Sequence, residues 1–252
     1  MEKLSAFNGD ADIKAAVMSQ LQAHYAADEI QHGYYWGNGK GCAVGCTVHS
    51  SDHSLYASLF QIPRILARLE DRIFEGMTNG DAKEFPLRFI DAIKPGADLS
   101  YVWPKFAVWL LVDETHGVVR HTKKDSAQYV AIHRVAELYR QTLDGVDVPK
   151  SDWQKARRDA SYAYAAAYAA AAAAYAYAYA ADADDDAAAY AADADDAAAY
   201  AADAYADADA ADAADAYADA DAYAAADAYA AARRKTFKRQ ADKLVQLLSE
   251  AT

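Results

Sequence analysis

Cysteine is nearly absent from this sequence, and uncharged apolar runs of about 18 residues are absent outside its Ala-rich part. Two cysteines in 252 residues, with no charged-then-apolar leader at Met1, favour a reducing compartment over a disulfide-stapled secreted domain. The Ala-rich part is not expected to span a membrane, because alanine and tyrosine are too weakly hydrophobic. We therefore expect a cytoplasmic protein without a membrane partner.

Glycine, proline, leucine and all β-branched residues are missing from one long segment. From Tyr162 to Ala232 each of the 71 residues is Ala, Asp or Tyr, in numbers of 44, 15 and 12. This segment contributes −15 to the net charge of −13, which leaves about +2 for the rest of the chain. Because negative charge repels nucleic-acid phosphates, we expect no direct nucleic-acid partner.

The first 145 residues have the periodicity of a small helical globular domain. One helix is predicted from Asp10 or Asp12 towards Gly33, and another from Pro63 to Gly76, each with apolar residues at helical spacing. Three more are expected at 80–93, 104–114 and 126–143. The aromatic residues expected in the core are Trp36, Phe60, Phe74, Phe85, Phe89, Trp103, Phe106 and Trp109.

The composition changes after residue 145 and divides the remaining chain into three parts. Residues 146–160 are predicted to be a hinge with a basic flank, and residues 161–232 form the Ala/Asp/Tyr repeat. Residues 233–252 are predicted to form a basic amphipathic helix. Its apolar stripe is expected to dock on the globular domain or on a second copy, and consists of Phe237, Ala241, Leu244 and Leu248.

The repeat carries conflicting signals about its secondary structure. Alanine favours helix, whereas between Ala201 and Ala232 alanine occupies 15 of the 16 even positions, an alternation typical of a strand. Every fourth residue from Ala194 to Ala230 is alanine, which suits helices that wind around one another right-handedly. We predict a mainly α fold in which a helical head precedes a long helical, supercoiled tail. The alternative for the tail is a narrow β-solenoid.

The glycine-rich segment 37–53 holds both cysteines and two histidines. On one helix Cys42, Cys46, His49 and His53 would share a face about 16 Å long, too long to place four ligands on one zinc ion. Only a loop, or a pair such as Cys46 and His49 with ligands from elsewhere, would bind a metal. We expect neither a metal nor a cofactor. Gly37–Gly41 also lacks the Ser or Thr after Lys40 that a phosphate-binding loop needs.

The alternative interpretation of this segment is thiol chemistry. A cysteine that begins a helix can have a lowered pKa, so Cys42 is a candidate nucleophile with His49 or His53 as general base. His24 and His32 are further candidates for the base. The plainer interpretation, which we favour, is that both cysteines are small buried residues in a tight packing corner.

Three stretches resemble an uncharacterised family of phage and bacterial proteins. They are GKGCAVGCTVHSSDH at 39–53, IPRILARLEDRIFEGM at 62–77 and FPLRFIDAIKPGADLS at 85–100. Similar proteins have an Ala-rich tail with a tetrapeptide repeat that ends in an ADKL-type helix, which here is Ala241–Leu244. This chain departs from them by carrying Asp and Tyr in the spacers. The resemblance implies that alanine packing is the shared requirement, and it brings no activity.

Three functions remain open. The first is a structural or interaction protein whose repeat mediates self-association, in a homo-oligomer or filament, or packing with a partner. The second is a Cys/His-dependent enzyme in the head. The third is an acidic decoy of a nucleic-acid-binding protein, although 15 Asp at about 1.5 Å rise per residue give roughly one charge per 7 Å, against about 1.7 Å in duplex DNA.

Overall fold

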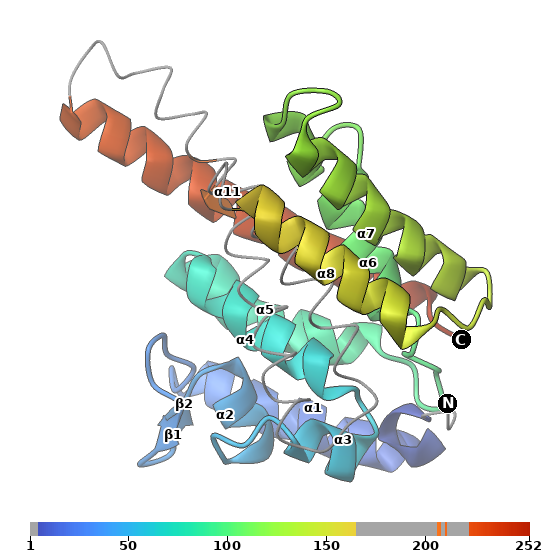
Figure 1. Cartoon of the computed structure of the whole chain (residues 1–252). Coiled ribbons are helices and arrows are strands. Elements are labelled where there is room, and N and C mark those ends of the chain that lie inside the picture. Colours follow the sequence, from blue (N-terminus) through green and yellow to red (C-terminus); the bar gives the residue numbers. More distant parts are fainter. Residues whose placement is uncertain (1–4, 165–205, 208–209, 211–221) are drawn as a thin grey trace. The chain divides into compact units, whose positions relative to one another are not determined.

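The computed structural model describes residues 5–164, 206–207, 210 and 222–252, and its described part is mainly helical (Figure 1). The chain divides into two compact units, Met1–Trp103 with Phe237–Thr252, and Pro104–Thr236. Composition alone predicts a boundary at residue 145, where the residue usage changes. The packing changes at other places, after Trp103 and before Phe237. Among the described residues, no helix combines the length and apolarity that a bilayer span requires.

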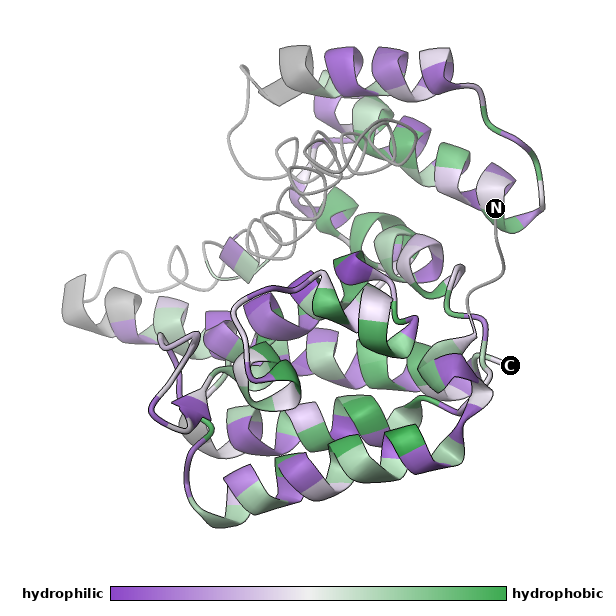
Figure 2. Ribbon diagram, turned by 90° about the horizontal axis from the view of Figure 1, so that it is seen from below, coloured by the Kyte–Doolittle hydropathy of each residue, from purple (hydrophilic) through white to green (hydrophobic). Residues whose placement is uncertain are grey.

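Six helical elements build the N-terminal part of the first unit. Helix α4 buries an apolar face that includes Leu66, Leu69 and Ile73, and hydrophobic and hydrophilic residues alternate around the helices in Figure 2. Packed pairs include α1 with α5, α4 with α5, and α2 with α1, α4 and α5. The elements are η1 (Ala6–Gly9), α1 (Ala11–Ala26), α2 (Ala43–Val48), α3 (Leu55–Phe60), α4 (Arg64–Gly76) and α5 (Asn79–Ala92).

The predicted helices begin close to where the structure begins them, but the predicted end of the first helix differs from the observed one. The Asp10 carboxylate accepts a hydrogen bond from the Asp12 amide at 2.8 Å and caps α1, as predicted. The predicted continuation towards Gly33 is wrong: α1 ends at Ala26, and Asp28 adopts a positive φ of 58° that no α-helix allows. Tyr25, in the last turn of α1, is 42% exposed.

The second unit contains η2 (Val118–His121), α7 (Ala127–Leu143) and α8 (Lys150–Tyr164), together with most of α6 (Val102–Val112). Helices α7 and α8 pack together, with the rings of Tyr139 and Trp153 4.8 Å apart and Arg134 paired with Asp152 at 3.4 Å. Residues 144–149 are the non-helical connection between α7 and α8, where the sequence predicts the hinge, whereas the basic flank that follows is helical and belongs to α8.

Helix α11 (Ala222–Glu250) continues from the repeat into the first unit. The predicted apolar stripe docks on that unit: Phe237, Ala241, Leu244 and Leu248 are all fully buried. Lys238 pairs with Asp81 at 2.8 Å, and Arg88 pairs with Asp242 at 2.7 Å. Of the two docking surfaces that the sequence allowed, the chain's own globular part is the one observed.

The described parts of the repeat are helical, at 161–164 in α8, at 206–207 and 210, and at 222–232 in α11. The predicted supercoil and its β-solenoid alternative concern the repeat as a whole. Most of that repeat, at 165–205, 208–209 and 211–221, lies outside the described residues.

Candidate functional site

A small β-hairpin introduces the glycine-rich segment. Strand β1 (Trp36–Gly37) pairs antiparallel with β2 (Lys40–Gly41), with Trp36 opposite Gly41. The two turn residues, Asn38 and Gly39, have positive φ values of 52° and 78°, as a type I′ turn demands. The Asn-Gly pair is a strong hairpin signal that our sequence analysis overlooked, because it considered Gly37–Gly41 only as a phosphate-binding loop.

Helix α2 is packed backbone against backbone on this hairpin. The Cys42 amide donates to the Tyr34 carbonyl oxygen at 2.6 Å, and the Cys42 thiol sulfur accepts from the Gly45 amide at 3.4 Å as the N-cap of α2. A Cβ atom on Gly45 would lie 1.7 Å from the Tyr35 carbonyl oxygen. The glycine is required because no side chain fits between the helix and the strand.

Helix α2 is too short to carry the predicted stripe of four potential ligands. It ends at Val48, and His49 follows in the left-handed region with φ 53° and ψ 36°. Cys42 and Cys46 remain one turn apart, but His49 and His53 leave the helical path. The one-face arrangement that we considered is therefore not formed, because the chain turns at His49 to enter the loop before α3.

Cys42 and His53 meet a common carboxylate in the interior. His53 is 3% exposed, and its Nε2 lies 3.2 Å from the Asp71 Oδ2 of α4. The Cys42 thiol, 2% exposed, also interacts with the Asp71 carboxylate. Burial raises the pKa of the Cys42 thiol, and the negative charge and hydrogen bond of Asp71 raise it further. The thiolate that the position at a helix start predicted is therefore disfavoured.

Cys46 is buried in the same way. Its sulfur is 3.4 Å from the Gly41 carbonyl oxygen, and burial raises the pKa of the thiol to about 12 despite a lowering contribution from the Gly41 backbone. Neither cysteine is in a disulfide. Both cysteines therefore resemble the buried packing residues that we favoured from the sequence. They have less in common with a nucleophile at neutral pH.

We expect both thiols to react with a disulfide reagent at about neutral pH at least 100-fold more slowly than a free model thiol, because each is buried and protonated. The absorbance of the chromophore that the reagent releases measures the rate of thiol labelling. The same chain unfolded in urea is the control and should release two equivalents rapidly. Native labelling of Cys42 at the rate of the model thiol would instead support the enzyme hypothesis.

A buried tyrosine–glutamate pair lies beside this cluster. Tyr56 of α3 and Glu70 of α4 are both fully buried, and the Tyr56 hydroxyl donates to the Glu70 Oε2 at 2.6 Å. The other carboxyl oxygen, Oε1, has no hydrogen-bond partner among the residues that the structure describes. Burial raises the pKa of Glu70 well above its usual range; the Tyr56 hydrogen bond opposes this shift and the charge of Asp71 adds to it. Burial therefore favours the protonated form of Glu70 over its ionised form.

The third predicted catalytic residue, His49, belongs to a different cluster nearer the surface. Its ring stacks on Trp36 with centroids 4.4 Å apart and an interplanar angle of 13°. Its Nε2 lies 2.8 Å from the Nε2 of His24, in the last turn of α1, and the His24 Nδ1 lies 2.7 Å from the Glu29 Oε2. Desolvation lowers the pKa of His49, and His24 lowers it further. Sequence reasoning considered His24 only as a possible base and did not connect it with Glu29.

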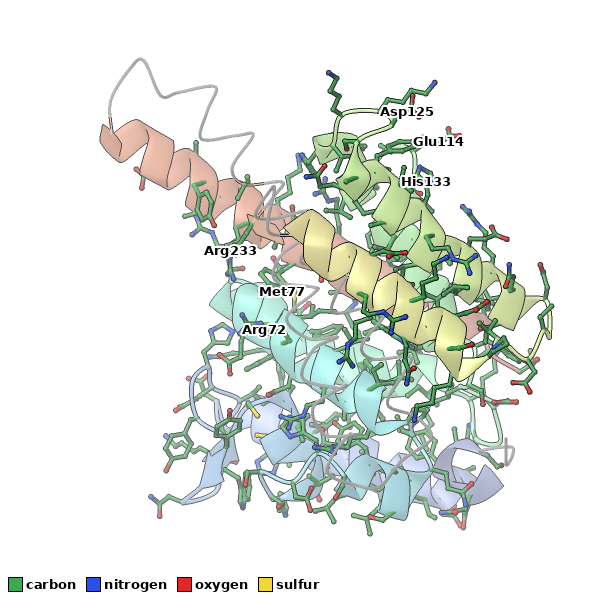
Figure 3. All side chains as sticks on the ribbon, in the orientation of Figure 1. Arg72, Met77, Glu114, Asp125, His133 and Arg233 are labelled. Carbon is green, nitrogen blue, oxygen red and sulfur yellow. The ribbon has the colours of Figure 1, made fainter. Side chains whose placement is uncertain are left out.

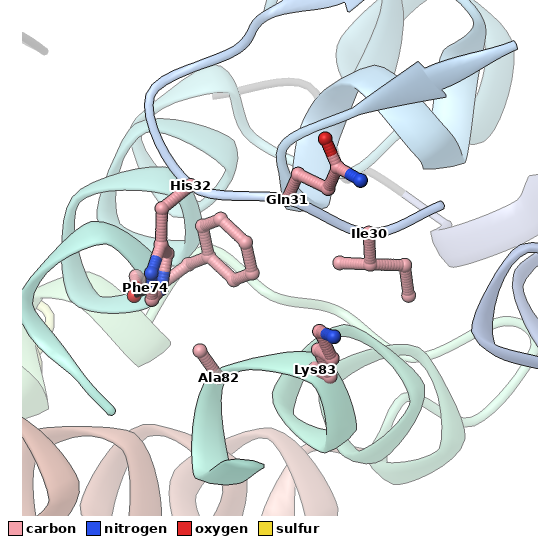
Figure 4. A pocket seen from close by; sticks show the side chains of 6 residues that line it. All are labelled: Ile30, Gln31, His32, Phe74, Ala82 and Lys83. Atoms are coloured by element: carbon pink, nitrogen blue, oxygen red, sulfur yellow. Dashed lines mark hydrogen bonds between the residues drawn. The ribbon is translucent and has the colours of Figure 1, made fainter. Parts of the chain in front are cut away.

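A cavity of about 370 Å³ lies elsewhere in the first unit (Figure 4). Its lining consists of Ile30, Gln31, His32, Phe74, Ala82 and Lys83. The His32 Nε2 is hydrogen-bonded to the Phe74 carbonyl oxygen at 3.0 Å, which occupies that ring nitrogen. None of the three predicted catalytic residues lines this cavity, so it does not bring a substrate to Cys42.

Comparison of the chain with protein-family models, with curated proteins and with solved structures gave no match.

Proposed function

We propose that this protein is a structural or interaction protein that acts through close packing of its Ala-rich repeat, with a second copy of itself or with another helical partner. One observation carries the proposal. Ala206 and Ala210, which are successive members of the four-residue alanine row, are both fully buried. Methyl-sized side chains at this spacing let helix backbones approach closely, so the row supports a packing surface.

Asp207, a spacer residue between these two alanines, shows how a spacer can support the same contact. The Asp207 Oδ1 accepts from the Tyr229 hydroxyl at 2.8 Å and from the Arg233 Nε at 2.9 Å. Tyr229 and Arg233 are one turn apart on α11, and Arg233 is labelled there in Figure 3. Burial raises the pKa of Tyr229, and the Asp207 carboxylate adds to the shift. All three residue types of the repeat, Ala, Asp and Tyr, thus take part in contacts within the chain.

These pairs also favour contact over the acidic decoy. The Asp207 charge is paired with Arg233 of the same chain, which weakens its attraction to a basic partner. The enzyme hypothesis has less support than contact because the Cys42 thiol is buried and protonated. A homo-oligomer or filament is therefore the assembly that we propose, formed when alanine rows of different copies pack as the row in one copy does.

The test compares the full chain with a variant in which Ala206 and Ala210 are both replaced by leucine. We expect the wild-type chain to associate as its concentration rises, and the double variant to stay smaller, because leucine holds the backbones apart. Sedimentation velocity from low to high micromolar concentration measures this. Ala231→Leu is the matched control, because Ala231 is exposed on α11. A wild-type chain that is monomeric throughout this range would refute self-association.

A further inference from the structure

The two histidines near the surface come from separate elements and point their ring nitrogens at each other. His24 lies in the last turn of α1 and His49 is the C-cap of α2, yet their Nε2 atoms are 2.8 Å apart. The His24 side chain is 12% exposed, whereas His49 is an exposed residue. The pair is therefore assembled by the packing of α1 on α2, and one side of it faces solvent.

A carboxylate orients the inner histidine. A carboxylate oxygen accepts hydrogen bonds, so the His24 Nδ1, 2.7 Å from the Glu29 Oε2, is assigned the hydrogen and the His24 Nε2 presents its lone pair to His49. Glu29 is itself fixed, because its amide donates to the His24 carbonyl at 2.9 Å and its carbonyl accepts from the Gly41 amide at 3.1 Å. A carboxylate behind a histidine that frees the Nε2 is the usual second shell of a metal-binding imidazole.

The outer histidine is held just as firmly. Its amide donates to the Gly45 carbonyl at 2.8 Å, and its ring lies flat on Trp36. His49 also adopts the left-handed backbone conformation, with φ 53°, which is uncommon for a residue other than glycine. These contacts place the ring opposite His24 rather than leaving it free in solvent.

We propose that His24 and His49 together bind one divalent transition-metal ion of the zinc class through their Nε2 atoms, with Glu29 as the outer carboxylate. Zinc binds imidazole nitrogen at about 2.0–2.1 Å, so two ligands at a tetrahedral angle lie about 3.3 Å apart. Zinc binding needs the two Nε2 atoms to separate from the observed 2.8 Å to about 3.3 Å, and the two rings to turn so that both lone pairs point at the ion. The hydrogen that the His49 Nε2 donates to His24 in the metal-free pair moves to the His49 Nδ1.

The remaining coordination positions would be taken by water or by an anionic ligand. Within the described residues, no group of three or more His, Cys, Asp or Glu side chains is arranged to hold a metal ion. Two protein ligands therefore make an open site rather than a closed structural one. This site is independent of the alanine packing in the repeat, so either proposal can fail without the other. The sequence predicted no metal because only the fold brings His24 to His49.

The full chain, freed of metal with a chelator, is titrated with zinc chloride by isothermal titration calorimetry. We expect one zinc ion per chain for the wild type, and at least about tenfold weaker binding for His24→Gln, His49→Asn and Glu29→Gln. Asparagine is chosen at 49 because it tolerates the left-handed backbone. His133→Gln on α7, labelled in Figure 3, is the control and should bind as the wild type does.

Cobalt substitution identifies the ligand atoms. We expect a Co²⁺ spectrum with nitrogen ligation and without the intense near-ultraviolet band of thiolate ligation, since Cys42 and Cys46 are buried. Circular dichroism verifies that each variant is folded. The proposal is overturned if the wild type binds no zinc, if folded His24→Gln and His49→Asn bind zinc as tightly as the wild type, or if the thiolate band appears.

Discussion

Replacing Gly45 with alanine is expected to lower the free energy of unfolding by about 3 kcal/mol or more, because the new methyl group would overlap the backbone. The added Cβ would lie 1.7 Å from the carbonyl oxygen of Tyr35, and this is a backbone atom that cannot move aside as a flexible side chain could. Relief requires α2 to shift from the hairpin, which breaks the hydrogen bond from the Cys42 amide to Tyr34.

Urea unfolding followed by tryptophan fluorescence measures this loss. Gly80→Ala is the matched control, since a Cβ atom at Gly80 of α5 meets nothing within 4 Å. That control should keep or slightly increase the stability, because alanine favours helix. If both variants unfolded at the same urea concentration as the wild type, α2 would not be packed on the hairpin as described.

Replacing Glu70 with glutamine is expected to remove a loss of stability that the wild type shows as the pH rises. Below the unfolded-state pKa of about 4.3 both states hold the proton, and above it only the folded state does, since burial raises the pKa of Glu70 in the fold. The unfolded state then binds fewer protons, so its relative free energy falls by about 1.4 kcal/mol per pH unit until the raised pKa is reached.

The groups that face Glu70 come from three elements. Tyr56 on α3 donates to it, Asp71 on α4 repels its charge, and Thr47 and Cys42 of the α2 region interact with the Tyr56 hydroxyl. Glutamine keeps an oxygen that can accept from Tyr56 and has no charge to bury. The stability advantage of Glu70→Gln over the wild type should therefore increase as the pH rises above the unfolded-state pKa of about 4.3.

Chemical unfolding at a series of pH values measures that difference. Glu84→Gln is the control, because Glu84 is exposed on α5 and water solvates its carboxylate in both states. Its curve against pH should run parallel to that of the wild type. A Glu70→Gln curve that is also parallel would show that Glu70 ionises in the fold, contrary to the pKa direction that its burial sets.

Much of the helical framework could be predicted, because its signals are local. The Asp10 cap, the apolar spacing after Pro63 and the stop at Gly76 each concern neighbours within one or two turns, and the structure places α1 and α4 there. The end of α1 was missed because the residues after it bond to partners that are distant in sequence: the Glu29 carbonyl to the Gly41 amide, and the Asp28 carboxylate to Lys83. Local periodicity does not contain that information.

The candidate site shows the same division. Cys42 was correctly placed at the start of a helix, since glycines before it break the preceding structure. Its inferred reactivity was not supported, because the pKa depends on burial and on Asp71 of α4, 29 positions away in the sequence. The pairing of His49 with His24, rather than with Cys42, depends equally on how α1 meets α2.

The sequence by itself determined that this chain is mainly helical, where most of its helices begin, and that its acidity belongs to a repeat of three residue types. These properties follow from propensity, capping and composition, which act over a few residues. Only the tertiary structure decided which side chains are buried and which meet. Ionisation, metal affinity and close packing all depend on distances between residues far apart in the chain, and folding alone sets those distances.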